Sequence, residues 1–400
     1  MSITVDGQGS GHGRGMSAWG NYGSAVNLRW SWQDILAYYY GGTQEGTGAN
    51  SPIKVRLFGL DNAPSTGVVS TIGQAIWNGL PYTSLQAREA SPNVYDIYAA
   101  ADLRCPNAAD GQVGSGWTLV AQGVTGPVVF TTTVDEATGP AGDVLGLCQP
   151  NGSVVHYRGS ITALNDSAGA NRTVNTALLE LYLRGVLSRE VPTSWGNAGG
   201  GAGMNALRAQ AVAARSFGVS QGRYSYAQTC DTTSCQVYGG SAYRATPTSP
   251  TSFRASAVCE SGNLTSECAN TNRAIADTAG VVRRWPNGAI VSTEYSSSHG
   301  PRSAGGPFPA VDDSASNVPG NSSYLWTRSI SAADLASRYG LGTLMAASSE
   351  ADPNVAHEGV WDNRVRLVGT NATVVVSNWD FRGAYGLNSS GFAITGVVPG

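Results

Sequence analysis

The chain has 400 residues, 41% of them hydrophobic and only 13% charged, with a formal net charge of -3. This length is ample for a sizeable core in two or three structural units, and 52 glycines favour loops and strands over long surface helices. Nucleic acid is excluded as an expected partner, because no basic stripe is present that could neutralise phosphates.

The cysteines and the N-terminus bear on the compartment. The six cysteines form three sequence-local pairs: Cys105 with Cys148, Cys230 with Cys235, and Cys259 with Cys268. Three disulfides would indicate an oxidising, extracytoplasmic setting, and six reduced, buried thiols are the alternative. No apolar run is long enough to span a bilayer, and MSITVDGQGS does not have the pattern of a signal peptide. We therefore expect a soluble protein without a membrane span, either cytosolic or secreted after removal of a leader, and the cysteines favour secretion.

Residues 8–41 begin with glycines that alternate around His12 and Arg14. Such a segment predicts an irregular loop whose backbone can approach a ligand or another part of the chain closely. His12 is as plausible in a structural role as in a binding site. Ser17 can cap a short helix, and SWQDILAYYYGG predicts a second helix that ends near Gly41.

Residues 51–168 have the pattern of a β-rich module. Short strands are expected in PIKVRLFGL, GVVSTIG, PVVFTTTV, GDVLGLC and SVVHYRGSITAL. Turns rich in Gly, Pro and Asn separate these strands. A role in packing or spacing is favoured over sugar binding.

The next segment, residues 177–195, reads ALLELYLRGVLSREVPTSW and predicts a helix with an acid at its end. Apolar residues from Leu179 to Leu187 recur at helical spacing, and one further turn on the same face reaches Glu190. Pro192 should end the helix there, leaving the carboxylate at the negative end of the helix dipole. Partial burial and the dipole would both raise the pKa of Glu190, as a proton donor requires. The alternative is an ordinary solvated glutamate at a frayed helix end.

An alanine-dense helix is predicted in MNALRAQAVAARSFGVS, where Arg208, Gln210 and Arg215 are the strongly polar residues. Its backbone can lie close to a neighbour. The loop GNAGGGAG before it is not a phosphate cradle, because no Gly-Lys-Ser/Thr follows.

Cys230 and Cys235 are separated by four residues, which favours a small disulfide loop over a metal site because further ligand types are sparse nearby. Such a loop would hold Gln236 and Tyr238 in fixed positions.

Residues 273–307 predict two strands around a WPNG turn, followed by a serine-rich loop closed by His299. A serine nucleophile is not expected, because no strand-to-helix elbow surrounds the serines and adjacent Ser and His cannot easily act together. A polar loop that lines a groove is favoured.

Together these stretches resemble the family of stage II sporulation protein D and the LytB amidase enhancer. The resemblance rests on YLRGVLSREVPTSW, ALRAQAVAARSF, TCDTTSCQVYGG, EYSSSHG and GHGRGMSAWGNYG, and with the tail FRGAYGLNSSGF it covers roughly half of the chain. It implies an α+β fold: a mixed core of short helices and antiparallel strands with an inserted β-rich module. The expected domains are a Gly-His-Gly segment packed on the core (1–50), the β-rich module (51–168) and the catalytic core (169–400).

The resemblance implies lytic transglycosylase cleavage of peptidoglycan. In the family, the acid matching Glu190 protonates the glycosidic oxygen between N-acetylmuramic acid and N-acetylglucosamine, and the muramic acid's own 6-hydroxyl closes on C1 to give a 1,6-anhydro end. Hydrolytic glycosidases normally need two carboxylates, whereas here the nucleophile belongs to the substrate. No second carboxylate stands in a comparably convincing motif. The alternative is a non-catalytic member that binds wall glycan and enhances a partner amidase.

Further residue roles follow from the resemblance alone. Arg184, Gln210 and Arg215 would fix the Glu190 helix or contact sugar. The groove would be lined by Gln236 and Tyr238, with Ser297, Ser298 and His299 as its opposite wall. The remaining substrate-binding candidates are His12, Arg14 and Ser17. No cofactor is expected.

The sequence departs from the family pattern in three places. Its Gly-His-Gly motif is N-terminal instead of C-terminal, with Ala18 where the family has Gln, which resembles a circular permutation. Residues 8–41 should therefore fold back against Glu190, close to the C-terminal tail. Ser234 replaces the histidine of zinc-binding members, so we expect no zinc. The NAGGGAG insertion lengthens a loop beside the catalytic helix and leaves the substrate preference open.

Overall fold

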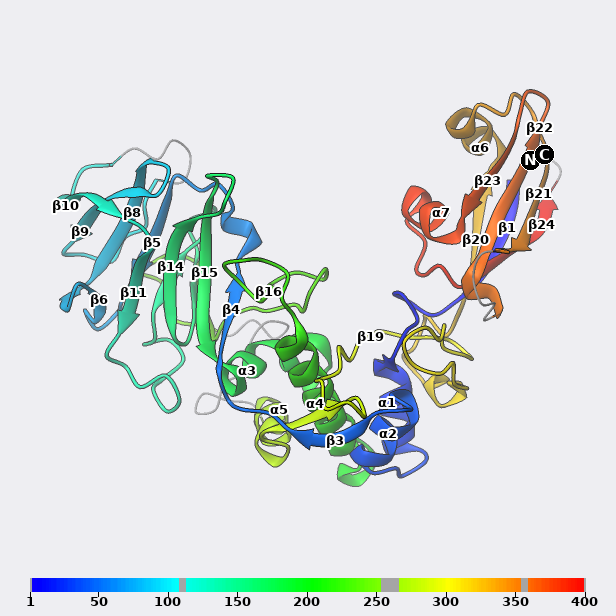
Figure 1. Ribbon diagram of the computed structural model, residues 1–400, viewed down its shortest axis with the longest axis horizontal. Coiled ribbons are helices and arrows are strands. Elements are labelled where there is room, and N and C mark those ends of the chain that lie inside the picture. Colours follow the sequence, from blue (N-terminus) through cyan, green and yellow to red (C-terminus); the bar gives the residue numbers. More distant parts are fainter. Residues whose placement is uncertain (1, 108–112, 253–265, 354–358, 399–400) are drawn as a thin grey trace.

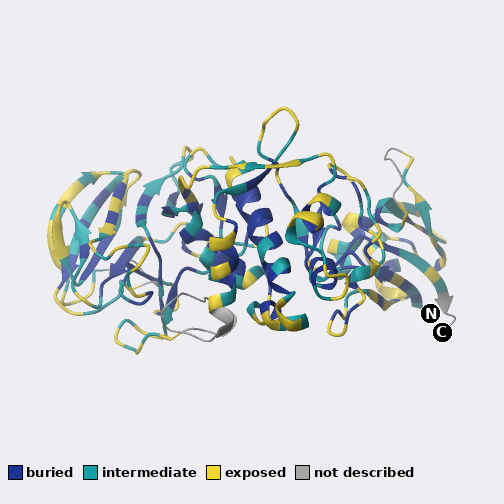
Figure 2. Ribbon diagram, turned by 90° about the horizontal axis from the view of Figure 1, so that it is seen from below, coloured by how far each residue is buried: buried dark blue, intermediate teal, exposed yellow. Residues whose placement is uncertain are grey.

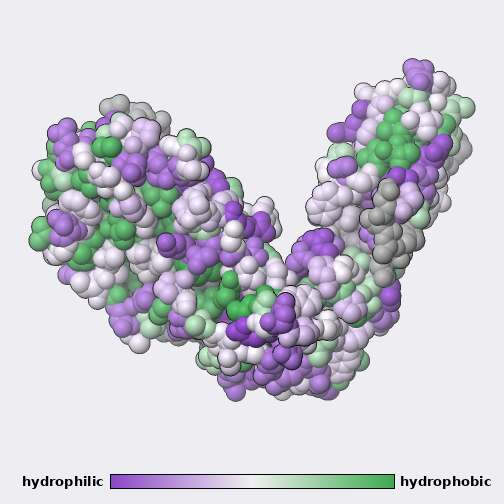
Figure 3. Space-filling model, in the orientation of Figure 1, coloured by the Kyte–Doolittle hydropathy of each residue, from purple (hydrophilic) through white to green (hydrophobic). Residues whose placement is uncertain are grey.

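The computed structural model describes residues 2–107, 113–252, 266–353 and 359–398, and it confirms the predicted α+β fold. Two β-rich arms rise from a helical base, and the N- and C-terminal strands lie side by side in the second arm (Figure 1). An open hollow separates the two arms above the base (Figure 3).

The first arm contains two sheets, each with seven strands in the described part of the chain. Their orders are β10-β9-β8-β5-β12-β13-β17 and β16-β4-β15-β14-β11-β6-β7. The strands are β4 (Pro52–Arg56), β5 (Ser65–Val69), β6 (Ala75–Trp77), β7 (Leu80–Tyr82), β8 (Ser84–Ser91), β9 (Val94–Ala100), β10 (Thr118–Thr125), β11 (Val128–Thr132), β12 (Gly146–Cys148), β13 (Val154–His156), β14 (Ser160–Asn165), β15 (Asn171–Leu178), β16 (Thr229–Cys230) and β17 (Ala242–Arg244). The short helix η1 (Phe58–Leu60) follows β4.

The β-rich module and the helical base share a strand. The boundary expected at residue 168 falls in the turn between β14 and β15, and β15 pairs with both β14 and β4 before it runs directly into helix α3. The later strands β16 and β17 also join the two sheets. One hydrophobic core therefore connects Val55 and Phe130 of the module with Leu183 and Leu207 of the base.

The base is built around α4 (Met204–Ser220), on which the other helices of the base pack. These are α1 (Ala18–Val26), α2 (Trp32–Tyr39), α3 (Leu179–Glu190), η2 (Thr193–Gly201) and α5 (Ser266–Asp277). Alanines on α4 let these neighbours approach closely, and buried residues concentrate in the central helices (Figure 2). As predicted, Ser17 caps α1 by accepting a hydrogen bond from the Gly20 N–H at 2.9 Å. A capping box of Ser31 and Asp34 begins α2.

Short strands and turns complete the base: β2 (Met16–Ser17), β3 (Gln44–Thr47), β18 (Val281–Arg284), β19 (Tyr295–Ser296) and η3 (Ser314–Ser316). Strand β18 pairs with β3, and β19 pairs in parallel with β2.

The second arm combines the two ends of the chain. The strand β1 (Ser2–Gln8) lies between β20 (Leu325–Ser331) and β24 (Phe392–Val398), and β22 (Asn363–Gly369) lies between β21 (Leu344–Ala351) and β23 (Thr373–Ser377). The helices of this arm are α6 (Ala332–Tyr339), η4 (Gly359–Asp362) and α7 (Asn378–Tyr385). The adjacent terminal strands have the geometry that a circular permutation requires. The Gly-His-Gly segment that was expected as one unit at residues 1–50 is therefore divided between two parts of the fold. Its first strand, β1, belongs to the second arm, and the residues after it pack on the base.

The glycine-rich loop connects β1 to the base. Ser10 forms a β-bridge with Ser298, and Gly11 forms one with Ser389 of the C-terminal tail, as the predicted fold-back requires. Gly13 and Gly15 have φ values of 76° and 67°. A Cβ at Gly15 would lie 2.0 Å from the Glu294 carbonyl oxygen, so this close approach needs glycine.

The predicted disulfides Cys105–Cys148 and Cys230–Cys235 are both formed. The third predicted pair lies outside the described residues, because Cys259 and the side chain of Cys268 fall in the part that is not described. In the described ranges, none of the helices has the length and apolar character needed to cross a bilayer.

Candidate active site around Glu190

Helix α3 delivers Glu190 to the site. Its apolar face, which includes Leu183, Val186 and Leu187, is completely buried, and the helix ends at Glu190 as predicted. Val191 then adopts an extended conformation before Pro192.

A buried ion pair fixes the first turn of the same helix. The fully buried Arg215 guanidinium donates to the Glu180 carboxylate at 2.8 and 2.7 Å. Arg215 also donates to the Val281 carbonyl oxygen at 3.1 Å, so it connects α3 to strand β18. This geometry holds the helix that carries Glu190.

The carboxylate of Glu190 sits in a pocket that favours its neutral form. Burial raises the pKa of Glu190 to about 7, although hydrogen bonds from the Val237 backbone N–H and the Tyr295 hydroxyl favour the charged form. The Val237 nitrogen lies 2.8 Å from Oε1. Near neutral pH both protonation states are therefore populated, as a group that first donates and then accepts a proton requires.

A relay of hydrogen bonds orients Tyr295 toward Glu190. The Tyr182 hydroxyl donates to the Gln236 side-chain oxygen at 3.0 Å, which fixes the orientation of that amide. The Gln236 nitrogen then donates to the Tyr295 oxygen at 2.9 Å. Because this oxygen already accepts from the amide, its own proton is left to donate to Glu190.

Glu190 lines a cavity of about 500 Å³ where several distant segments meet. Its lining includes His12 and Arg14 from the glycine-rich loop, Ser234 and Val237 near the disulfide loop, Glu294 and Ser297 from the serine loop, and Trp379 and Arg382 from α7. His12 thus shares a cavity with Glu190, as the displaced motif predicted.

An ion pair occupies the same cavity. Arg14 donates to both oxygens of Glu294, at 2.9 and 2.8 Å. Burial opposes ionisation of Glu294, but the Arg14 guanidinium outweighs it and lowers the pKa of this carboxyl group. The cavity therefore carries two carboxyl groups whose environments move their pKa values apart. Glu294 was not predicted as a site residue, although it stands two positions before the serine run in EYSSSHG.

His12 is neutral at neutral pH and has a defined tautomer. Burial, and then the nearby Arg14 charge, lower the pKa of His12. The Arg14 backbone N–H donates to His12 Nδ1 at 3.0 Å, so the ring proton is on Nε2.

The two residues expected to line the groove after the disulfide loop do not do so. Burial alternates along this extended segment, so Gln236 and Tyr238 point into the protein and Val237 faces the cavity. Gln236 acts on Glu190 indirectly, because its amide nitrogen donates to the Tyr295 oxygen and the Tyr295 hydroxyl donates to Glu190. The Tyr238 hydroxyl donates to Asn175 Oδ1 at 2.8 Å within the core.

The serine loop also contributes fewer residues to the wall of the cavity than predicted. Ser297 lines the cavity, but Ser298 is fully buried and accepts from the Asn321 amide at 3.1 Å. His299 is likewise buried, 3.6 Å from Asp313, and burial lowers its pKa to about 3. Ser17 is buried as the cap of α1, away from the cavity. The loop therefore presents no exposed Ser–His pair for nucleophilic catalysis.

The remaining candidates support the fold instead of lining the cavity. Arg184 lies six residues before Glu190, on another side of α3, and donates to the Ala137 carbonyl oxygen of the β-rich module at 3.2 Å. Gln210 is fully buried in α4. Arg215 holds α3 through its ion pair, as described above.

The inserted loop after α3 contributes none of the described residues that line the cavity. Gly199 and Gly200 have φ values of 59° and 66°, and Arg29 donates to the Gly199 carbonyl oxygen. Within the described residues, no group of three or more His, Cys, Asp or Glu side chains is arranged to hold a metal ion.

Comparisons with known proteins agree with the resemblance seen in the sequence. Residues 167–285 match the stage II sporulation protein family, SpoIID. A protein of Bacillus subtilis (strain 168) described as an amidase enhancer is 31% identical over 118 residues, which are 30% of this chain but only 12% of that relative. No solved structure matches the chain. The matched segment contains Glu190 and the disulfide loop, whereas the glycine-rich loop, the serine loop and α7 lie outside it.

Proposed function

From the match of residues 167–285 to the SpoIID family, we propose that the protein acts on cell-wall glycan as a lytic transglycosylase with Glu190 as its acid and base. The observation that carries this proposal is the buried Glu190, whose pKa is raised to about 7 within a cavity open to a ligand. A solvated glutamate would be ionised at neutral pH and could not donate a proton.

The proposed reaction needs one proton donor and no water. Protonated Glu190 gives its proton to the glycosidic oxygen, and the bond between that oxygen and C1 of the muramic acid breaks. The 6-hydroxyl oxygen of the same sugar bonds to C1, and the Glu190 carboxylate takes the hydroxyl proton. This returns the acid to its starting state and leaves a 1,6-anhydro end.

The second carboxylate has a different part in this proposal. Glu294 stays ionised beside Arg14, so it cannot replace Glu190 as the donor. Its negative charge on the cavity wall favours the positive charge that develops at C1 as the glycosidic bond breaks.

A second candidate function is favoured by the relative described as an amidase enhancer. In that case the cavity binds wall glycan without cleaving it, and the bound protein stimulates a partner amidase. Both candidates place the protein outside the cytoplasm, in keeping with the two disulfides among the described residues.

One experiment separates the two candidates. Peptidoglycan with and without stem peptides is incubated with wild-type protein and with Glu190→Gln, and anhydro-muropeptides are measured by mass spectrometry. Product from wild-type protein alone supports catalysis. Product from neither, together with faster release of stem peptides by an added wall amidase, supports the enhancer.

A further inference from the structure

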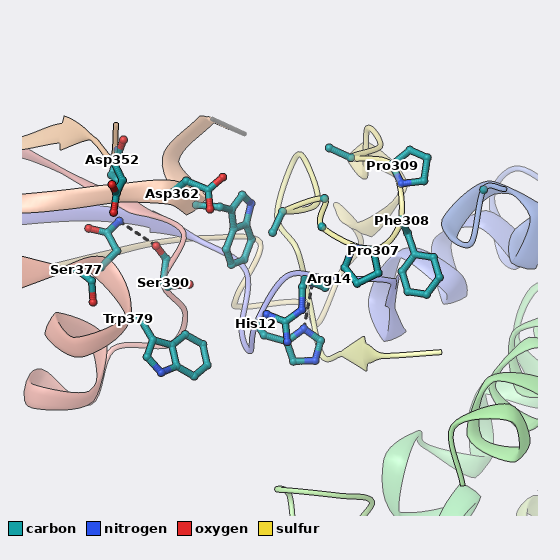
Figure 4. Close-up of a pocket in the computed structure, with 18 of the residues that line it drawn as sticks. His12, Arg14, Pro307, Phe308, Pro309, Asp352, Asp362, Ser377, Trp379 and Ser390 are labelled. Atoms are coloured by element: carbon teal, nitrogen blue, oxygen red, sulfur yellow. Dashed lines mark hydrogen bonds between the residues drawn. The ribbon is translucent and has the colours of Figure 1, made fainter. Parts of the chain in front are cut away.

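A second, larger cavity of about 920 Å³ adjoins the Glu190 cavity. The two share His12, Arg14 and Trp379 as lining residues, so they meet at these side chains. Figure 4 shows His12 and Arg14 in the middle of this larger cavity, between Trp379 on one side and Pro307 and Phe308 on the other. Its volume lies near the upper end of the range of about 300–1,000 Å³ for ligand sites.

Aromatic side chains stand on both walls of the larger cavity. On the base, Trp285 stacks on Phe308 with ring centroids 5.7 Å apart and an interplanar angle of 8°. On the second arm, Trp379 is 54% exposed, and the Arg382 guanidinium lies 5.1 Å from its ring centroid. An indole supported on one face by another group can offer its other face to the apolar face of a sugar ring.

The polar lining suits an uncharged ligand rich in hydroxyl groups. Asp352, Asp362 and Asn363 line the wall formed by the second arm. Carboxylate and amide oxygens accept hydrogen bonds from hydroxyl groups. Among the described residues that line this cavity, Arg14 is the single Lys or Arg, and its charge already pairs with Glu294. A phosphate-bearing ligand is therefore disfavoured.

Trp361 of the second arm packs against the loop that lines both cavities. Its indole N–H donates to the Arg302 carbonyl oxygen at 2.9 Å. A Cβ at Gly13 would lie 2.6 Å from the ring and one at Gly391 would lie 2.8 Å from it, so both glycines press against the indole. The loop that carries His12 is thus anchored to the second arm.

We propose that the larger cavity is a second glycan-binding site, which holds further sugars of the strand whose scissile bond lies at Glu190. This inference rests on the proposed function for the identity of the ligand. Of the described residues in the SpoIID segment, Trp285 is the one that lines this cavity, so nearly all of the described lining lies outside residues 167–285.

The test is binding of a β-1,4-linked hexamer of N-acetylglucosamine to the full chain carrying Glu190→Gln, measured by titration calorimetry. Trp285→Ala and Asn363→Ala are introduced separately, because both residues line the larger cavity and not the Glu190 cavity. Met345→Ala is the control, since Met345 is 62% exposed on the second arm, which also carries Asn363, and lines neither cavity. Thermal melting verifies that each variant is folded.

We expect Trp285→Ala to weaken hexamer binding by about tenfold or more, as loss of a buried aromatic anchor does, and Asn363→Ala to weaken it severalfold. Met345→Ala should bind like the parent. Hexamer binding that is absent, or unchanged in both cavity variants, overturns the second site. The proposed activity of Glu190 is judged separately, by anhydro products from the wild-type protein, so either proposal can fail alone.

Discussion

Replacing Glu190 by Gln should stabilise the folded protein at pH 8 and leave its stability unchanged at pH 4. In the folded state the pKa of Glu190 is raised from 4.5 to about 7, mainly by burial. Between pH 4.5 and about pH 7 the folded chain keeps a proton on Glu190 that the unfolded chain has released. The free energy of unfolding of the wild type therefore falls as pH rises through this range. Glutamine carries no charge in either state and can still accept the Val237 N–H.

The size of this effect follows from the two pKa values. At about 1.4 kcal/mol per unit of pKa, the shift from 4.5 to about 7 corresponds to about 3.5 kcal/mol once the wild-type carboxyl group is fully ionised. We expect Glu190→Gln to gain about 3 kcal/mol at pH 8, about 2 kcal/mol at pH 6, and about zero at pH 4. This gain is what the protein forgoes by keeping a proton donor at this position.

The assay is urea unfolding followed by tryptophan fluorescence at the three pH values. Glu45→Gln is the matched control, because Glu45 is an exposed carboxylate on β3 and its replacement should change stability by less than about 0.5 kcal/mol. Equal stabilities of wild type and Glu190→Gln at pH 8 would refute the reasoning. So would a gain that is the same at pH 4 and pH 8.

Three other variants test the surroundings of this acid. Tyr295→Phe removes a hydrogen bond to the carboxylate, which is worth about 1.5–3 kcal/mol, so the pKa of Glu190 should rise by about one unit or more in a carbon-13 NMR titration; an unchanged or lower pKa would show that this hydroxyl does not act on it. Arg14→Met removes the cation that holds the pKa of Glu294 down, so burial should then dominate and that pKa should rise in the same titration, whereas a fall would contradict the ion-pair assignment. Arg215→Met leaves the carboxylate on the first turn of α3 without its buried partner and should lower the free energy of unfolding by about 3–5 kcal/mol in urea; a loss below about 1 kcal/mol would mean that this pair does not hold the helix.

Several features of the fold and the site could be predicted from the sequence because they depend on neighbouring residues. The helical spacing up to Leu187 and the position of Pro192 determine that α3 ends at Glu190 with an apolar face beneath it. Ser17 could be recognised as a helix cap, since capping acts over three residues. The pairing of Cys230 with Cys235 follows from their short separation.

Other parts of the site were decided by packing between segments that are far apart in the chain. Arg14 and Glu294 are 280 positions apart, and nothing local to either residue indicates that they form an ion pair. Trp379 reaches the site on a helix of the second arm, whose place depends on the pairing of β1 with β24.

The acid on which the proposed function depends shows both contributions. The sequence determined that Glu190 stands at the end of an apolar helix face, because spacing and proline act locally. Only the tertiary structure decided which groups surround its carboxylate. The Val237 N–H follows the disulfide loop and the Tyr295 hydroxyl belongs to β19; their hydrogen bonds lower the pKa of Glu190, but burial outweighs them and raises it to about 7. Desolvation depends on every segment that covers a group, so it cannot be inferred from the neighbours of that group in the sequence.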